Sequence, residues 1–135
     1  MLALIAPLKT RLGKLPQLTG WDVRTNTEEV DRSKVPAADI RCVGATASAK
    51  AGAVTLSAQW RITLVVSRSS TAADTLDTAM GAVICSLHGW QPGQQGDRGW
   101  NRLELLSATE PDFASEGVVG YELTFSTAGL YTGQQ

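Results

Sequence analysis

The feature that most constrains the fold is an alternation of apolar and polar residues from Val54 to Val66. Every even position in this stretch is apolar, and the odd positions carry Thr, Ser, Gln and Arg before Val65. Because successive side chains of a strand point to opposite faces of a sheet, the pattern predicts one long strand with a single buried face. Such a strand needs further strands beside it and an apolar layer against its even-numbered side.

The flanking segments supply candidate partner strands. Residues 39–46 predict a strand that pairs with the long one, and residues 47–52 carry the turn residues of a hairpin with an extended tip. Further strands are expected at residues 21–25, 102–108 and 118–126. Polar, proline-containing stretches at 25–38 and 109–117 predict loops, and the tail from residue 127 is expected to be loose at its end.

Two segments instead have helical periodicity. Apolar residues at spacings of three and four predict a short helix that begins near Leu4 and ends at Gly13. The same spacing predicts a longer helix through Ala73, Leu76, Met80, Val83, Ile84 and Leu87. Thr71 is its expected N-cap, with Asp74 in the first turn, and Gly89 is its expected left-handed terminator.

The order of these elements is helix, three strands, helix, two strands. It predicts the α+β class, with an antiparallel-rich, mixed sheet and two helices packed on it, in the order α-β-β-β-α-β-β. A length of 135 residues predicts a single domain over residues 1–135.

Composition argues against several classes of function. Twelve basic residues nearly cancel 13 acidic ones, and a net charge of −1 gives no electrostatic basis for sequence-specific nucleic-acid binding. No segment approaches the roughly 20 apolar residues of a membrane span, and the apolar opening lacks the features of a signal peptide. Cys42 and Cys85 lie 43 positions apart and are expected to be reduced, buried small hydrophobes of a protein made in a cytoplasm.

Residues suited to catalysis are scarce. His88 is the single histidine, and its position at a helix end favours a role as a cation or a donor to the last carbonyls. The glycine-rich stretch from Gly89 to Gly99 follows a helix, opens a strand and has no lysine, so it does not match a phosphate-binding loop. The chain is therefore expected to be neither an enzyme nor a holder of metals or cofactors.

Two tryptophans, Trp90 and Trp100, bracket that glycine-rich stretch. Large rings at both ends of a loop bury area and pin the loop to the domain. The interpretation is a pinned joint whose middle, Gln91 to Gly99, is free to contact a neighbouring subunit. The odd-numbered face of the long strand is polar but poor in Lys and Glu, which favours a protein that assembles over one surrounded by water.

The stretches LHGWQPGQQGDRGWNRLELLSAT and VVGYELTFS, within this order of elements, resemble the tail terminator proteins of long-tailed bacteriophages over roughly residues 1–130. The resemblance implies a small α+β protein without catalytic residues that assembles into a hexameric ring. It also implies a ring that caps the finished tail tube, ends its polymerisation and presents a surface to the head-tail connector protein. The expected partners are further copies of the chain, the tail tube protein and the connector, and the expected location is the virion, assembled in the host bacterial cytoplasm.

Candidate interface residues follow from exposure and pattern within three loops (25–37, 47–52 and 91–99) and the polar strand face. They are Glu28, Glu29, Arg32, Lys34, Lys50, Thr55, Ser57, Gln59, Arg61, Gln94, Asp97 and Arg98. Two alternatives stay open at this point. One is a head-completion or connector protein of the phage neck, and the other is a small-molecule-binding α+β domain.

Overall fold

A computed structural model describes residues 1–113 and 116–133 of the chain. The helices are η1 (Leu2–Leu4), α1 (Ile5–Gly13), η2 (Pro16–Leu18) and α2 (Ala72–Leu87), of which η1 and η2 are short 3-10 turns. The strands are β1 (Asp22–Thr25), β2 (Ala37–Lys50), β3 (Ala53–Ser67), β4 (Gly93–Gln94), β5 (Gly99–Trp100), β6 (Glu104–Thr109) and β7 (Val118–Thr132). The predicted α+β class and the order of the main elements are confirmed.

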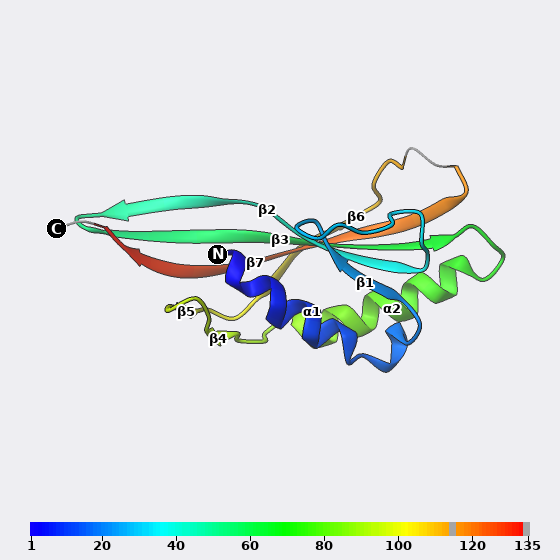
Figure 1. Ribbon diagram of the computed structural model, residues 1–135, viewed down its shortest axis with the longest axis horizontal. Coiled ribbons are helices and arrows are strands. Elements are labelled where there is room, and N and C mark those ends of the chain that lie inside the picture. The colour runs from blue at the N-terminus through cyan, green and yellow to red at the C-terminus, as the bar shows by residue number, and fades with distance from the viewer. Residues whose placement is uncertain (114–115, 134–135) are drawn as a thin grey trace.

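The strands of the described chain form one mixed sheet in which β3 is central. The order β1-β2-β3-β7-β5-β4 contains one parallel pair, β1 with β2, and β6 also pairs with β7. Both α-helices lie on the same side of this sheet, and β2, β3 and β7 extend past them as a long arm (Figure 1). The sheet therefore has a face covered by helices and a face turned away from them, called here the open face.

The core forms where the even-numbered face of β3 meets the helices. Trp60, Ile62 and Leu64 are fully buried there, as predicted from the alternation. Leucines of α1 and α2 and the β7 residues Leu123 and Phe125 complete the layer. Each such side chain contributes roughly 1.5 to 3 kcal/mol through the apolar surface it removes from water.

The β2–β3 hairpin is longer than its sequence indicates. Residues 47–50 were expected to form an extended tip, but they continue β2, and only Ala51 and Gly52 form the turn. Residues 47–50, two alanines, one serine and one lysine, have weak strand propensity, and pairing with the apolar start of β3 overrides it. The expectation of an extended loop at 47–52 was therefore wrong.

The tail is also more ordered than expected. Residues 127–132 continue β7 and pair with β3 as far as Thr132. Gly129 permits this, because a Cβ there would lie 2.7 Å from the Trp100 ring. The end of the tail, where looseness was expected, lies outside the described residues.

Both ends of α2 differ in part from expectation, although Gly89 is left-handed as expected, with a φ of 82°. The Thr71 side chain makes no capping hydrogen bond, and its backbone N–H donates to Ser69 Oγ instead, at 3.3 Å. His88 was expected to donate to the last helix carbonyls, but its Nδ1 accepts a hydrogen bond of 3.1 Å from the backbone N–H of Leu105. The imidazole thus ties the end of α2 to β6. Ala73 is exposed, because Ala72 and Ala79 occupy the buried side of the helix.

The expected tryptophan anchors of the glycine-rich joint are confirmed. Trp100 is buried and its Nε1 donates to the Gln95 carbonyl at 3.0 Å. Trp90 is half-buried against the core with the Arg11 guanidinium 4.7 Å above its ring. The middle of the joint contains the small β4–β5 hairpin, which sequence reasoning missed.

The two cysteines were only partly predicted. Neither is in a disulfide, but Cys85 is exposed and Cys42 is half-buried. Cys85 lies on the outward side of α2, because the residues around it at Val83 and Leu87 face the core. The expectation that both would be buried small hydrophobes was therefore wrong.

Candidate functional site

The odd-numbered side chains of β3 lie on the open face of the sheet. Thr55, Ser57, Gln59 and Arg61 are half-buried there and alternate with buried residues that point to the helices. Across the strand pairs they meet more small or hydroxyl side chains, such as Thr46 opposite Ser57 and Ser126 opposite Gln59. Along the arm, this face is therefore polar and almost without charge.

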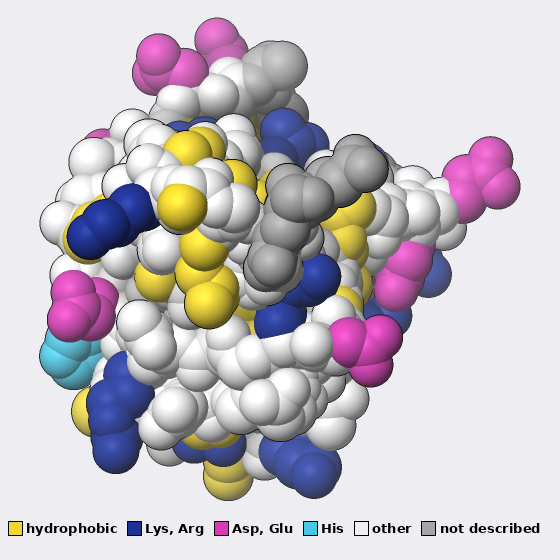
Figure 2. Space-filling model, turned by 90° about the vertical axis from the view of Figure 1, so that its left-hand side faces the viewer, with side chains coloured by type: hydrophobic (Ala, Val, Ile, Leu, Met, Phe, Trp, Pro, Cys, Tyr) yellow, Lys and Arg dark blue, Asp and Glu magenta, His cyan; other side chains and the backbone are white. Residues whose placement is uncertain are grey.

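The outer edge of β2 is open along the same arm. On its outer side β2 pairs with β1 only from Ala37 to Ile40, and in the described chain no strand pairs with the edge beyond. From Val43 to Lys50 the residues are exposed, and only Lys50 is charged. Figure 2 looks onto this end of the molecule, where hydrophobic side chains gather left of centre and acidic ones lie toward the outline. Edges of this kind offer unpaired backbone groups to another chain.

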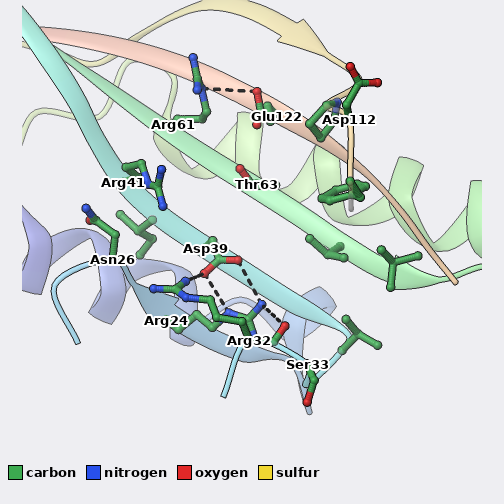
Figure 3. A pocket seen from close by; sticks show the side chains of 16 residues that line it. Arg24, Asn26, Arg32, Ser33, Asp39, Arg41, Arg61, Thr63, Asp112 and Glu122 are labelled. Atoms are coloured by element: carbon green, nitrogen blue, oxygen red, sulfur yellow. Dashed lines mark hydrogen bonds and ion pairs between the residues drawn. The ribbon is translucent and has the colours of Figure 1, made fainter. Parts of the chain in front are cut away.

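At the other end of the open face lies a hollow of about 510 Å³. Its floor is formed by β2, β3 and β7, and its walls by residues 26–35 and 111–113. Charged and apolar side chains both line it, and Figure 3 shows the charged ones, among them Arg24, Arg32, Asp39, Arg41, Arg61 and Glu122. We call this feature the open-face hollow.

Arg24 fixes one wall of the open-face hollow. Its side chain is only 3% exposed, and its Nε donates to Asp39 at 2.8 Å. The two Nη atoms donate to the carbonyls of Asp31, Arg32 and Lys34, so that one guanidinium holds the loop that follows β1. Burial alone would lower the pKa of Arg24, but the hydrogen bonds and charges of Asp39 and Asp22 outweigh it and raise that pKa.

The floor contains a cross-strand pair of like charges. Arg41 of β2 is directly opposite Arg61 of β3 in the register. Arg61 Nε lies 3.5 Å from Glu122 Oε2, and this nitrogen is buried without a hydrogen-bond acceptor. In Figure 3, Arg41 lies between two ion-paired groups, Arg24 and Arg32 with Asp39 on one side and Arg61 with Glu122 on the other.

Of the candidate residues in the 25–37 loop, Arg32 reaches the hollow. It pairs with Asp39 and donates to the Thr25 carbonyl at 3.1 Å. Glu28 instead accepts from Lys9 of α1 at 2.8 Å, which ties the loop to the helix layer. Glu29 and Lys34 are exposed.

The other candidates lie apart from the hollow. Lys50 ends β2 at the tip of the arm. Gln94 and Asp97 are exposed on the β4–β5 hairpin, on the helix side of the sheet (Figure 1). The Arg98 guanidinium stacks 3.6 Å from the centre of the Tyr131 ring and donates to the Gly96 carbonyl, so it holds the hairpin in place. Of the candidates, only Arg32 and Arg61 line the open-face hollow in the described chain, and Thr55, Ser57 and Gln59 continue from Arg61 along the same face of β3.

Several residues of the hollow were missed by sequence reasoning. Arg24 lies in the strand expected at residues 21–25, but its burial was not predicted. Its signal was weak: a single arginine next to the last residue of a short strand. Arg41 could have been found, since pairing 39–46 with the long strand places it near Arg61. Phe113 and Glu122 come from distant segments and gave no signal.

Within residues 1–113 and 116–133, no three His, Cys, Asp or Glu side chains are grouped so that they could hold a metal ion. In the same part of the chain, no helix has the length and apolar character needed to cross a bilayer.

The chain is similar in fold to solved structures. No protein-family model matches the chain, and no curated protein matches its sequence. Among solved structures, a chain described as "Virion of native gene transfer agent (GTA) particle" superposes with a TM-score of 0.59 at 15% sequence identity. The match covers 93% of this chain and 86% of that one, so the two chains share a fold over nearly their whole length.

Proposed function

We propose that this protein is a structural component of the virion of a phage-like particle, and within it a tail terminator. Copies of the chain would form a closed ring, expected to be a hexamer, that caps the tail tube and ends its polymerisation. The observation that carries this proposal is the fold shared, over 93% of the chain, with a chain of a gene transfer agent virion.

The surface of the arm supports assembly. A ring of identical subunits needs a heterologous contact, in which one patch of a subunit meets a different patch of the next. The unpaired edge of β2 and the uncharged polar open face beside it supply one such patch. Exposed Leu130 on the open face and Leu106 on β6 add apolar area at separate places. The mechanism is steric: the ring matches the last tube ring on one side only.

The proposal concerns partners and location as well. One side of the ring would contact the tail tube protein and the other the head-tail connector protein. The protein would then be found in the virion after assembly in the host bacterial cytoplasm. Because the mechanism is one of surface fit, we propose no catalytic step and no cofactor.

The proposal is tested by mixing purified protein with polymerising tail tube protein of the same particle. Mass photometry and negative-stain electron microscopy should show closed rings and tubes whose length stops increasing once the ring is bound. A strict monomer that leaves tube growth unchanged would contradict the proposal. Rings that bind the connector and ignore tubes would instead identify a neck protein.

A further inference from the structure

The open-face hollow contains arginine donors that the described chain does not satisfy. We propose that it binds an acidic segment of a protein partner, with a carboxylate bridging Arg41 and Arg61. The proposal goes beyond ring formation, because the hollow lies within a single subunit and needs no second copy to be complete.

Two positive side chains, Arg41 and Arg61, lie directly opposite each other on neighbouring strands. Residues directly opposite in an antiparallel pair have Cβ atoms about 4.5 to 5.5 Å apart, and like charges there are destabilising. Arg41 and Arg61 hold such positions on neighbouring strands. A carboxylate between them would accept hydrogen bonds from both guanidinium groups and convert the repulsion into attraction.

The acids nearest to Arg41 and Arg61 are either paired with other residues or too far away for a hydrogen bond. Asp39 already accepts from Arg24 and is paired with Arg32. Glu122 is 3.5 Å from Arg61 Nε, which has no hydrogen-bond acceptor although it is buried. Arg41 is exposed, and its side chain has no hydrogen bond or ion pair to any residue of the described chain. Buried polar groups normally have a hydrogen-bond partner, so the lack of one at Arg61 Nε indicates that an acceptor is missing.

The hollow is larger than a single ion and partly apolar. Its volume is about 510 Å³, and its lining includes Val35, Pro111, Phe113 and Val118. Four arginines and three acids line it, so its net charge is small and positive. That balance fits one or two carboxylates beside an apolar side chain. A nucleic-acid backbone needs a broader cationic surface, because affinity there grows with the number of phosphates neutralised.

The wall of the hollow is held before any partner arrives. The Arg24 side chain fixes three carbonyls of residues 31–34, and Asp31 accepts from both the backbone N–H and the hydroxyl of Ser33. A site that is already ordered loses less conformational entropy on binding. The partner segment therefore meets a formed hollow.

The test uses the full-length protein labelled with ¹⁵N and titrated with a capped Leu-Glu-Asp-Leu tetrapeptide. Saturable shifts of the Nε–H signals of Arg41 and Arg61 are expected. Arg41→Gln and Arg61→Gln should each weaken binding about tenfold or more, since hydrogen bonds to charged groups are among the strong ones. Lys50→Gln removes the same charge from the far end of β2 and should leave the affinity unchanged.

Three results would overturn the inference. The first is a lack of saturable shifts in the wild-type protein. The second is equal binding of the uncharged Leu-Gln-Asn-Leu peptide, or equal binding of the acidic peptide to both arginine variants. The third is tighter binding of an eight-nucleotide oligothymidylate at the same signals. Because the titration is performed on unassembled protein, its failure would leave the proposed tail-capping role intact, and a failure to form rings would leave the hollow untouched.

Discussion

Trp60 and Arg61 are consecutive residues of one strand in very different surroundings. Trp60 is fully enclosed between the sheet and the helices, whereas the Arg61 side chain is 39% exposed on the open face. On the first side, tight packing of apolar groups sets the stability. On the second, polar side chains are left incompletely paired and therefore available to partners. The comparison indicates that stability and recognition are separated by the two faces of β3.

The largest expected effect comes from removing a large side chain from the face of β3 that the helices cover. Trp60→Ala should lower the free energy of unfolding by roughly 3 to 5 kcal/mol, because the fully buried ring leaves a cavity. Trp60→Phe should cost much less, since the buried Trp60 Nε1 has no hydrogen-bond partner to lose. Urea denaturation followed by circular dichroism measures both. A smaller loss for the alanine variant than for the phenylalanine variant would refute the assignment of Trp60 to the core.

The next effect tests whether Arg24 stabilises the loop beside the open face. Arg24→Gln should lower the free energy of unfolding by about 3 kcal/mol, because it breaks a buried pair with Asp39 and frees three loop carbonyls. Lys34→Gln changes the same charge at an exposed position of that loop and is the control. The measurement is again urea denaturation, and equal, small losses in both variants would show that Arg24 does not hold the wall.

A smaller change in stability, with a larger one in assembly, is expected at Arg61. Arg61→Glu should alter the free energy of unfolding by only about 0.5 kcal/mol, as at other partly exposed surface positions. Its charge reversal on the open face should nevertheless impair ring formation, measured by mass photometry. If Arg61→Glu and Trp60→Ala unfolded the protein equally, the division of β3 into two faces would be refuted.

The smallest effect concerns pH at the rim of the open-face hollow. The Ser33 hydroxyl and backbone N–H lower the pKa of Asp31 below its ordinary value. A lowered folded-state pKa means that the carboxylate stabilises the fold above the ordinary pKa, and that this contribution is lost as pH falls through the lowered one. The difference in stability between wild type and Asp31→Asn should therefore shrink in acid. In the Ser33→Ala background, which lacks one donor, the difference should vary less with pH.

Sequence patterns predicted the helix-covered face of the sheet better than the open face. Alternation in β3 and the spacing in α2 are local signals of burial, and both were confirmed except at Ala73, which is exposed. The ends of elements were less predictable: residues 47–50 and 127–132 become strand because β3 lies between them and supplies hydrogen bonds to both. The strand propensity of a segment does not depend on a partner strand that is distant in sequence, so it could not predict this pairing.

The candidate site was less accessible to prediction for the same reason. Arg32 and Arg61 were singled out, but what unites them is the register of β2 and β3 and the loop held by Arg24. The like-charge pair of Arg41 and Arg61 exists only once that register is known. Glu122 reaches the hollow through the pairing of β7 with β3, and Phe113 through the segment that follows β6, and no short motif encodes either.

The open edge of β2 has a consequence for amide hydrogen exchange. In an edge strand, alternate N–H groups point away from the neighbouring strand, so along Ala45–Lys50 those on the outer side meet water while those toward β3 are held. Deuterium uptake in the isolated protein should therefore alternate between fast and slow along these residues. A subunit that pairs with this edge would slow exchange of the outward-facing amides and leave exchange of those bonded to β3 unchanged. Exchange along β2 would therefore report, residue by residue, whether a second subunit has bound.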